Sequence, residues 1–439
     1  MDRVPAVTGG LPFRVFAPLV AALLLAAPVA QAAAVPRGAL LSVRLTTPVS
    51  SRSSRPGDPV EAVLIAPVRA GDEVVLPAGG RLHGRVLARR SGFYRRAALR
   101  LHFDEMVAAD GRHLAIDAQV VEVDNAREQV APDGTIRGRG AFTHPSTVHL
   151  ALLAAASAHP VTLALLELGR FAKEKIQRGA VEYRPGVELE LALERPVADP
   201  QESLDGLEPP PIEGAAFPDR PQPTPVPIAV DALPLLTVAP KSGRTSDLTN
   251  VLLVGTRAEV ESAFVAAGWV RAGEMHPGAA VHAILALAGH RRYDRAPVSR
   301  MEIDGRPPDL VFEKQCNTLA KRHHVRLWGG FAGPGGREAW LGAATHDVAI
   351  AYSHTEHTLT HRIDPLIDRE RTKLVDDLSF AGRVADAELL ERPRAPRVFT
   401  VAAGESVETD GRIAVVLLET EPGPTAKVAA NLPPDAFAR

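Results

Sequence analysis

The alternation of apolar and polar residues divides the chain into a β-rich first half and a mixed second half. In the first half, short segments place every second residue on an apolar face, which is typical of strands with one buried side. Turns that contain Gly and Pro separate these segments at regular intervals. The pattern predicts a small all-β barrel or sandwich within residues 38–194. The expected strands are 41–45, 60–68, 81–87, 98–103, 114–123 and 187–193.

Residues 145–172 interrupt this pattern with two nearly continuous apolar runs on either side of His159 and Pro160. Proline removes a helical hydrogen bond and disfavours the helical conformation of the residue before it. The pattern therefore predicts an apolar helical insertion, either two short helices or one kinked helix. The structural interpretation is that this insertion packs over an open end of the barrel.

The second half of the chain combines buried strands with two helical patterns, which predicts a C-terminal α+β domain over residues 247–391. The Pro-rich residues 195–246 are typical of a semi-rigid linker, so few contacts are expected between the two folded parts. Residues 392–439 are expected to form a tail with a hairpin at Asp410-Gly411. The fold class is thus predicted to be multi-domain. The expected elements of the second domain are strands 251–255, 325–328 and 339–349, a hairpin around Asp304-Gly305, and helices 258–267 and 364–378.

The first 32 residues have the pattern of a secretory signal peptide. Arg3 and Arg14 supply a positive start, and residues 15–28 form a short apolar stretch. Ala30-Gln31-Ala32 then provides a small-x-small cleavage site. The apolar stretch is shorter than the about 20 residues that a spanning helix needs, and an uncleaved anchor is the alternative. The segment predicts an exported protein of the periplasm or cell envelope, with the mature chain beginning near Ala33.

Charge and cysteine content narrow the classes of partner and site. The formal net charge of −2 argues against nucleic acid as a partner, because nucleic acid requires a basic face. Cys316 is the single cysteine, so the chain can form neither an internal disulfide nor a cysteine-based zinc site. Any metal site would have to use histidine and carboxylate side chains.

Short motifs centred on turns recur along residues 38–125. They are TTPVSS at 46–51, PGDPVEAV at 56–63, VLPAG at 75–79 and the following Gly84. With these motifs the segment resembles the β-barrel region of TrbI-like conjugation and type IV secretion proteins. The resemblance implies a barrel fold, and it suggests an envelope or secretion-associated protein as a partner. In that family an apolar helical insertion projects from the barrel towards the membrane, so the resemblance also implies a peripheral membrane contact through residues 145–172.

A longer series of motifs runs through the second half. They are DLTNVLLVG at 247–255, AFVAAGW at 263–269, APVS at 296–299, GRPPDL at 305–310, RHHVRLW at 322–328, WLGAATHD at 340–347, HRID at 361–364 and DRER at 368–371. Over residues 246–390 the chain thereby resembles the LssY-like C-terminal domain family. Membrane domains often accompany domains of that family, which implies an envelope or lipid context. The resemblance does not imply a particular reaction.

Polar residues at strand and helix spacing mark a candidate site. Nine of the fifteen histidines fall between His276 and His361. A random distribution of surface histidines along the chain explains this density poorly. On a strand, His324, Arg326 and Trp328 would share one face, while Val325 and Leu327 point to the core. On a helix that begins near 363, three further polar residues would share one side, just after His361. The candidate binding residues are His324, Arg326, Trp328, Asp347, His361, Asp364, Asp368 and Arg371.

Three interpretations of this set stay open. It is a structural salt-bridge network, a polar site that holds an anion, or a metal site in which His361, Asp364 and Asp368 bind zinc or manganese. No helical zinc motif, G-x-S-x-G elbow, P-loop or Rossmann pattern occurs, so no metal ligand, cofactor or catalytic residue is assigned. The predicted function is an exported envelope protein whose LssY-like domain binds a polar or anionic ligand or a partner without chemistry of its own. The alternative is a metal-dependent hydrolase of phosphoesters or glycans.

Overall fold

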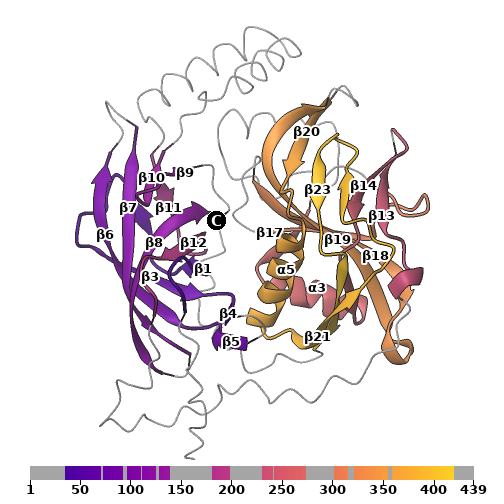
Figure 1. Ribbon diagram of the computed structural model, residues 1–439, viewed down its shortest axis with the longest axis horizontal. Helices are drawn as coiled ribbons and strands as arrows, with labels where there is room; N and C mark the ends of the chain where they lie inside the picture. Colours follow the sequence, from indigo (N-terminus) through magenta and orange to yellow (C-terminus); the bar gives the residue numbers. More distant parts are fainter. Residues whose placement is uncertain are drawn as a thin grey trace, which may run out of the picture.

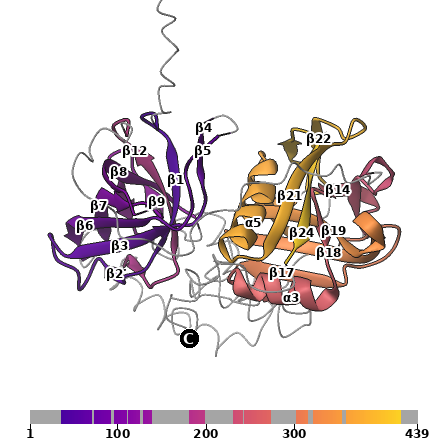
Figure 2. The same cartoon turned by 90° about the horizontal axis from the view of Figure 1, so that it is seen from below.

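The computed structural model describes residues 35–70, 73–91, 96–109, 111–124, 128–138, 180–197, 230–240, 242–272, 301–314, 321–353 and 358–419. The predicted signal peptide (residues 1–32), the predicted apolar insertion 145–172 and residues 198–229 of the predicted linker lie outside this set. Two β-rich parts lie side by side, and helix α5 (Asp368–Phe380) lies on the side of the second part that faces the first (Figures 1 and 2). Within these ranges no helix has the length and apolar character to cross a bilayer.

The first part is a six-stranded antiparallel barrel. Its strands follow the order β6-β3-β1-β12-β8-β7, and β6 also pairs with β7, which closes the ring. Alternate side chains point inward and form one continuous apolar core, as in Leu99, Leu101 and Phe103 of β7. The predicted barrel is therefore confirmed. The strands are β1 (Leu40–Leu45), β3 (Pro59–Leu64), β6 (Arg81–Arg90), β7 (Ala98–Val107), β8 (His113–Val123) and β12 (Glu188–Leu193).

Short strand pairs complete the barrel part. One pair extends the sheet beyond β7, and two others form separate ribbons. The pairs are β9 (Gln129–Val130) with β10 (Thr135–Arg137), β2 (Val49–Ser50) with β11 (Glu182–Tyr183), and β4 (Val68–Ala70) with β5 (Glu73–Leu76).

The second part is built on one large mixed sheet with the order β16-β17-β18-β19-β15-β24-β21, and β20 pairs with β19. Helix α3 (Arg257–Ala266) and helix α5 pack on one face of this sheet and share its apolar core. All pairings in the sheet are antiparallel except β15 with β24. The strands are β15 (Val251–Val254), β16 (Trp269–Arg271), β17 (Leu310–Lys314), β18 (Arg322–Ala332), β19 (Glu338–Ser353), β20 (Thr358–Ile363), β21 (Val384–Glu391) and β24 (Arg412–Leu418).

Local sequence explains the bounds of α3. Thr256 and Glu259 form a capping box, in which each side chain accepts a hydrogen bond from the other residue's backbone N–H. Val260 and Phe264 recur at helical spacing and are buried. The helix ends before Gly268, whose φ of +78° suits the left-handed turn that follows a helix. The predicted helix 258–267 is thus present within one residue at each end.

The boundaries expected at 246 and 391 both cut through this fold. Strand β24 lies inside the large sheet, between β15 and β21, and its almost wholly apolar sequence suits a strand covered on both faces. The hairpin expected at Asp410-Gly411 instead joins β22 (Val398–Thr400) to β23 (Ser406–Glu408), and Asp410-Gly411 leads into β24. The C-terminal end of the expected linker forms the strand pair β13 (Leu236–Ala239) and β14 (Arg244–Leu248).

The turn at Asp304-Gly305 is present, although the hairpin expected around it is not. Both residues have positive φ, 51° and 74°, and Ile303 bridges to Arg306, as in a tight two-residue turn. Strand β17, however, pairs with β16 and β18 rather than with the residues before the turn. The turn chemistry was readable locally, whereas the strand partners depend on the whole sheet.

A partly buried acid on barrel strand β12, Glu190, gives a prediction about pH. Burial raises the pKa of Glu190 to about 7, and the Ser42 hydroxyl donates a hydrogen bond to its Oε1 at 2.5 Å. The protonated form is favoured in the folded state, so this group's contribution to the free energy of unfolding should fall as pH rises from about 4.5 to about 7. At 1.36 kcal/mol per pKa unit, the loss reaches ~3 kcal/mol.

Replacing Glu190 by glutamine should remove this loss. Urea unfolding at pH 5, 6, 7 and 8 should show a variant that gains stability relative to the native chain as pH rises. Burial also raises the pKa of Asp376 to about 7, but that residue is common to both proteins and cancels in their difference. A difference that does not change with pH would contradict the prediction.

Candidate functional site

The central strands β18 and β19 carry polar side chains on both faces of the large sheet. Because side chains alternate along a strand, His323 points to the face covered by α3 and α5, while His324 points to the opposite face, here called the far face. The far face is covered partly by β13 and β14, on the side away from the barrel (Figure 1). The two faces hold two separate polar clusters.

The far-face cluster gathers around the carboxylate of Asp347, which is buried. Arg322 donates two hydrogen bonds to its Oδ2, from Nε at 3.0 Å and from Nη2 at 2.8 Å. The Nδ1 atoms of His324 and His361 lie 3.7 and 3.6 Å from the same oxygen. His361 comes from β20, and its side chain is 25% exposed, whereas that of Asp347 is 3% exposed.

The other polar side chains on the far face have partners as well. Arg326 donates from Nη1 to Oδ2 of Asp247 at 2.6 Å, and Asp247 belongs to β14. The Thr345 hydroxyl lies 2.8 Å from Nε2 of His324. Trp328 donates its indole N–H to the backbone oxygen of Arg306 at 2.9 Å. The far-face cluster is therefore Asp247, Arg322, His324, Arg326, Thr345, Asp347 and His361.

Burial and the two guanidinium groups set the protonation of the far-face cluster. Burial, together with the charges of Arg322 and Arg326, outweighs the opposing charge of Asp347 and lowers the pKa of His361 to about 4. Burial also holds the pKa of His324 well below its ordinary value. Burial opposes ionisation of Asp347, but the surrounding basic groups outweigh it and depress its pKa. Two neutral imidazoles thus face a carboxylate that is already paired with an arginine.

The other predicted site residues form a separate group at the start of α5. Arg371 donates from Nη1 to Asp368 at 3.1 Å and to Asp410 at 2.8 Å. Asp364 caps a turn by accepting from the N–H of Leu366 at 2.9 Å. The expectation that Asp364, Asp368 and Arg371 share one side of a helix is wrong, because residues 358–363 form β20 and the helix begins at Asp368. Pro365 disfavours helical conformation at the residue before it.

The second polar cluster lies between the barrel and the helix-covered face of the large sheet. Glu188 of β12 accepts from Arg44 of β1 at 2.8 Å and from Lys373 of α5 at 2.5 Å, and Lys314 of β17 lies 3.4 Å away. Lys314 also lies 2.6 Å from Asp377 of α5. These side chains are at most 5% exposed, except Lys373 at 19%. They form, with Asp124, His323 and Glu370, the interface network.

Apolar contacts accompany the interface network. Val63 and Ile65 of the barrel pack with Phe380, the last residue of α5, and all three are buried. The guanidinium of Arg44 lies 5.6 Å from the centre of the Phe380 ring. The expectation that few contacts join the two parts is therefore wrong. A linker composition says how the chain connects two domains, and it carries no information on whether their surfaces match.

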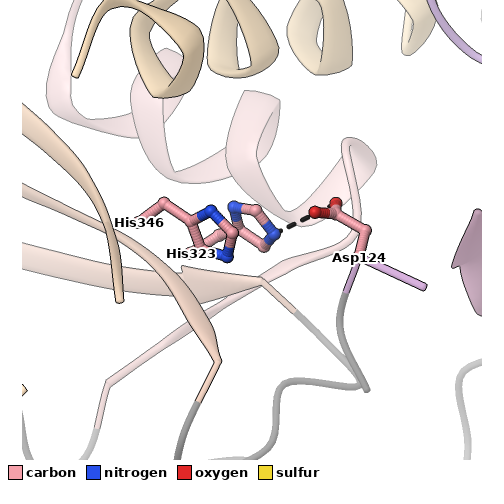
Figure 3. Close-up of side chains that lie close together, drawn as sticks. All are labelled: Asp124, His323 and His346. Atoms are coloured by element: carbon pink, nitrogen blue, oxygen red, sulfur yellow. Dashed lines mark ion pairs between the residues drawn. The ribbon is translucent and has the colours of Figure 1, made fainter. Parts of the chain in front are cut away.

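Three side chains of the interface come close enough to hold a metal ion: Asp124, His323 and His346 (Figure 3). One ligand atom from each lies within 4.8 Å of the others. His323 Nε2 is 3.0 Å from Asp124 Oδ2, and its Nδ1 is 2.7 Å from Glu370 Oε2. The rings of His323 and His346 are stacked, with centres 4.0 Å apart. Asp124 directly follows β8 of the barrel, whereas both histidines belong to the large sheet.

The electrostatic environment gives the two stacked rings opposite protonation states. Burial opposes charge on His323, but Asp124 and Glu370 outweigh it and raise its pKa to about 10. Burial, together with the neighbouring His323, lowers the pKa of His346 to about 3. Without a metal, His323 is thus an imidazolium held between two carboxylates, and His346 is a neutral imidazole with an available nitrogen lone pair.

Sequence reasoning missed Asp124, His323 and His346. The strand alternation that selects His324 for one face places His323 with Val325 and Leu327 on the other, which is the expected core face. One signal was available: two histidines stand at corresponding positions of two adjacent strands, and the structure pairs them directly, His323 opposite His346. Asp124 carried no such signal, because its proximity depends on how the barrel packs against the sheet.

Neither cluster has the arrangement of an exposed catalytic group. Thr345, His324 and Asp347 follow one another like a hydroxyl–imidazole–carboxylate relay, yet each is only 2% exposed. The 3.7 Å between His324 Nδ1 and Asp347 also exceeds hydrogen-bonding distance. Of the two clusters, the far-face cluster offers buried charge pairing and a partly exposed imidazole in His361. The interface holds a group of side chains of metal-ligand type, found among the residues that the structure describes.

Comparisons with known proteins identify the C-terminal part. Residues 231–413 match the family described as the LssY C-terminus. Among solved structures, the chain is similar to ComB10 of the Com Type IV secretion system of Helicobacter pylori, at 14% sequence identity and a TM-score of 0.23, over 38% of this chain and 90% of that chain. A search of curated proteins found no match. The resemblance to the LssY C-terminal family that the sequence motifs predict is confirmed, and the matching segment of this chain is residues 231–413.

Proposed function

We propose that this chain is an exported protein of the cell envelope whose LssY C-terminal domain binds a polar or anionic ligand and performs no chemistry of its own. The signal-peptide pattern of residues 1–32 supports export. The observation that carries the binding proposal is His361, the one member of the far-face cluster whose imidazole reaches the surface above two buried arginines.

The charges of the far-face cluster favour binding over catalysis. The guanidinium groups of Arg322 and Arg326 are balanced by the carboxylates of Asp347 and Asp247, so the cluster is close to neutral. A ligand at His361 therefore meets a neutral imidazole set in a fixed polar frame. Such a site recognises a polar group or an anion through hydrogen bonds rather than through net charge.

The alternative of a metal-dependent hydrolase at this His/Asp cluster has less support. Oδ2 of Asp347, the oxygen nearest both histidines, already accepts two hydrogen bonds from Arg322. A metal ion there would lie beside a guanidinium group. The predicted ligands Asp364 and Asp368 make their own contacts elsewhere, at the turn before α5 and with Arg371.

Inorganic phosphate is the probe for this proposal. Adding about 50 mM phosphate to the chain without its first 32 residues should raise the melting temperature more than the same ionic strength of chloride. A Kd on the order of 1 mM corresponds to about −4 kcal/mol and would stabilise the folded state by about 2 kcal/mol at that concentration. Replacing His361 by alanine should abolish the phosphate-specific part.

A second histidine provides the control. His113 is exposed on β8, where its Nδ1 lies 2.9 Å from Glu105, so its replacement by alanine should leave the phosphate effect intact. Phosphate also stabilises proteins non-specifically, and that component should be equal in all three proteins. An equal shift in the native chain and in the His361 variant would refute binding at this position.

A further inference from the structure

We propose that Asp124, His323 and His346 bind a divalent transition-metal ion of the zinc type, which joins the barrel to the LssY C-terminal domain. The proposal goes beyond ligand binding at the far face, because this site lies on the opposite side of the sheet and shares no residue with it. Asp124 comes from the barrel and both histidines come from the large sheet (Figure 3).

The donor set fits such an ion in type and spacing. Imidazole nitrogen and carboxylate oxygen are ordinary zinc ligands at about 2.0–2.2 Å, so donor atoms on one ion lie roughly 3–4 Å apart. The three donor atoms here all lie within 4.8 Å of one another, and His323 Nε2 and Asp124 Oδ2 are 3.0 Å apart. Small rotations of the side chains would bring all three to one centre, with water or a further group completing the coordination.

Glu370 supplies a supporting contact that metal-bound histidines usually have. Its Oε2 lies 2.7 Å from His323 Nδ1, so it accepts the proton of that nitrogen and leaves Nε2 directed at Asp124. A carboxylate behind a ligating histidine fixes the ring and increases its basicity. Glu370 is buried on α5, so the contact is held by the packing of that helix on the sheet.

His346 is the second, independent observation. Its Nε2 is buried and has no hydrogen-bond partner among the residues that the structure describes. A buried polar atom in this condition requires an explanation, and an unseen ion is one of those that apply. A metal ion shared with Asp124 would satisfy it.

The charges of the site balance when the ion replaces a proton. Without metal, a protonated His323 forms an ion pair with Asp124, with its Nε2 3.0 Å from Oδ2. On binding, the ion takes the place of the Nε2 proton, which is released to solvent, and the carboxylates of Asp124 and Glu370 offset the two positive charges. Lys373 lies 3.5 Å from Asp124, but its ammonium also pairs with Glu188 at 2.5 Å.

Zinc titration tests the proposal. The purified mature chain, stripped with EDTA and dialysed, should bind one equivalent of zinc at these residues with micromolar or tighter affinity by calorimetry, and zinc should raise its melting temperature. His346→Gln and Asp124→Asn should each weaken this binding by about 100-fold or more. Glu370→Gln, which keeps the side-chain shape, should weaken it by about 10- to 100-fold. His113→Gln, at an exposed histidine beside a carboxylate, should bind zinc like the native chain.

The outcomes separate a metal site from a structural cluster. If the three residues serve only packing, the variants will change the melting temperature of the zinc-free protein, and zinc binding will be absent or equal in all proteins. Either result overturns the proposal. If His346→Gln fails to fold, Asp124→Asn decides, because the Asp124 side chain lies at the edge of the interface with 16% exposure. Loss of zinc binding in a folded Asp124→Asn variant, with binding retained in His113→Gln, supports the site.

Discussion

Replacing Glu188 by glutamine should lower the free energy of unfolding by about 3–5 kcal/mol, which is the range for removing one member of a buried ion pair. The Glu188 carboxylate lies against three cations, Arg44 from the barrel and Lys314 and Lys373 from the C-terminal domain. Without it, these cations would share Asp377, apart from the contact of Lys373 with Asp124. The measurement is urea unfolding of both proteins at pH 7, followed by circular dichroism.

The effect should depend on pH in a defined direction. Burial opposes ionisation of Glu188, but Lys314, Lys373 and Arg44 outweigh it and hold its pKa below the ordinary 4.5. Its stabilisation is therefore present above pH 4.5 and is lost as the pH falls through the depressed pKa. The difference between the native chain and the glutamine variant should shrink in acid.

Two further measurements isolate the interface as the cause. In a double-mutant cycle with Lys373→Gln, the two losses should be non-additive by 1 kcal/mol or more, because the side chains touch across the interface. Glu391→Gln is the exposed control, since Glu391 also accepts from an arginine, Arg412 at 2.6 Å, but is 52% exposed. That substitution should leave stability nearly unchanged. Equal losses for Glu188 and Glu391 would contradict the role of burial.

The interface network also joins the barrel and the C-terminal part through specific contacts. A small barrel and an LssY C-terminal domain joined by a Pro-rich segment would be free to move independently if their surfaces did not match. Here Glu188 and Asp124 of the barrel meet Lys373 and His323 of the C-terminal part inside a largely buried contact. Opposite charges set the register of the two surfaces, because any other arrangement would leave them buried without a counter-charge.

Much of the fold could be predicted from sequence because its signals are local. The strand alternation of β7 and the capping box of α3 each depend on residues close together in the chain. The order of strands in the large sheet does not. Strand β24 pairs in parallel with β15 after about 160 intervening residues, and the sequence of neither strand identifies the other as its partner. From sequence alone, the apolar residues 412–418 are equally compatible with one strand of a hairpin that turns at Asp410-Gly411.

The candidate site shows the same division. Alternation along one strand correctly placed His324 and Arg326 on one face, and Asp347 with His361 joined them from neighbouring strands. Alternation also assigned His323 to the core, but it could not show that the core there ends at a polar interface. Residues that come together only when two folded parts pack have no periodic signal in either part.

Replacing Gly84 by alanine should destabilise the barrel by about 3 kcal/mol, because overpacking of a closed structure forces its backbone apart. A Cβ at this position would lie 2.2 Å from the backbone oxygen of His102 and 2.9 Å from the Cα of Phe103. Both atoms belong to β7, whose pairing with β6 closes the ring, and the pairing is irregular at Gly84. Glycine in a strand often marks such a close approach of backbones.

A neighbouring glycine makes the test specific. Gly80 directly precedes β6, and a Cβ there would meet its nearest atoms at 3.4–3.5 Å, which is ordinary contact. Gly80→Ala should therefore change the urea midpoint little, while Gly84→Ala lowers it strongly. Both substitutions reduce the entropy of the unfolded chain to a similar extent, so that term cancels between them. If the two variants unfold at the same midpoint, steric closure at β6 and β7 is not what requires glycine at position 84.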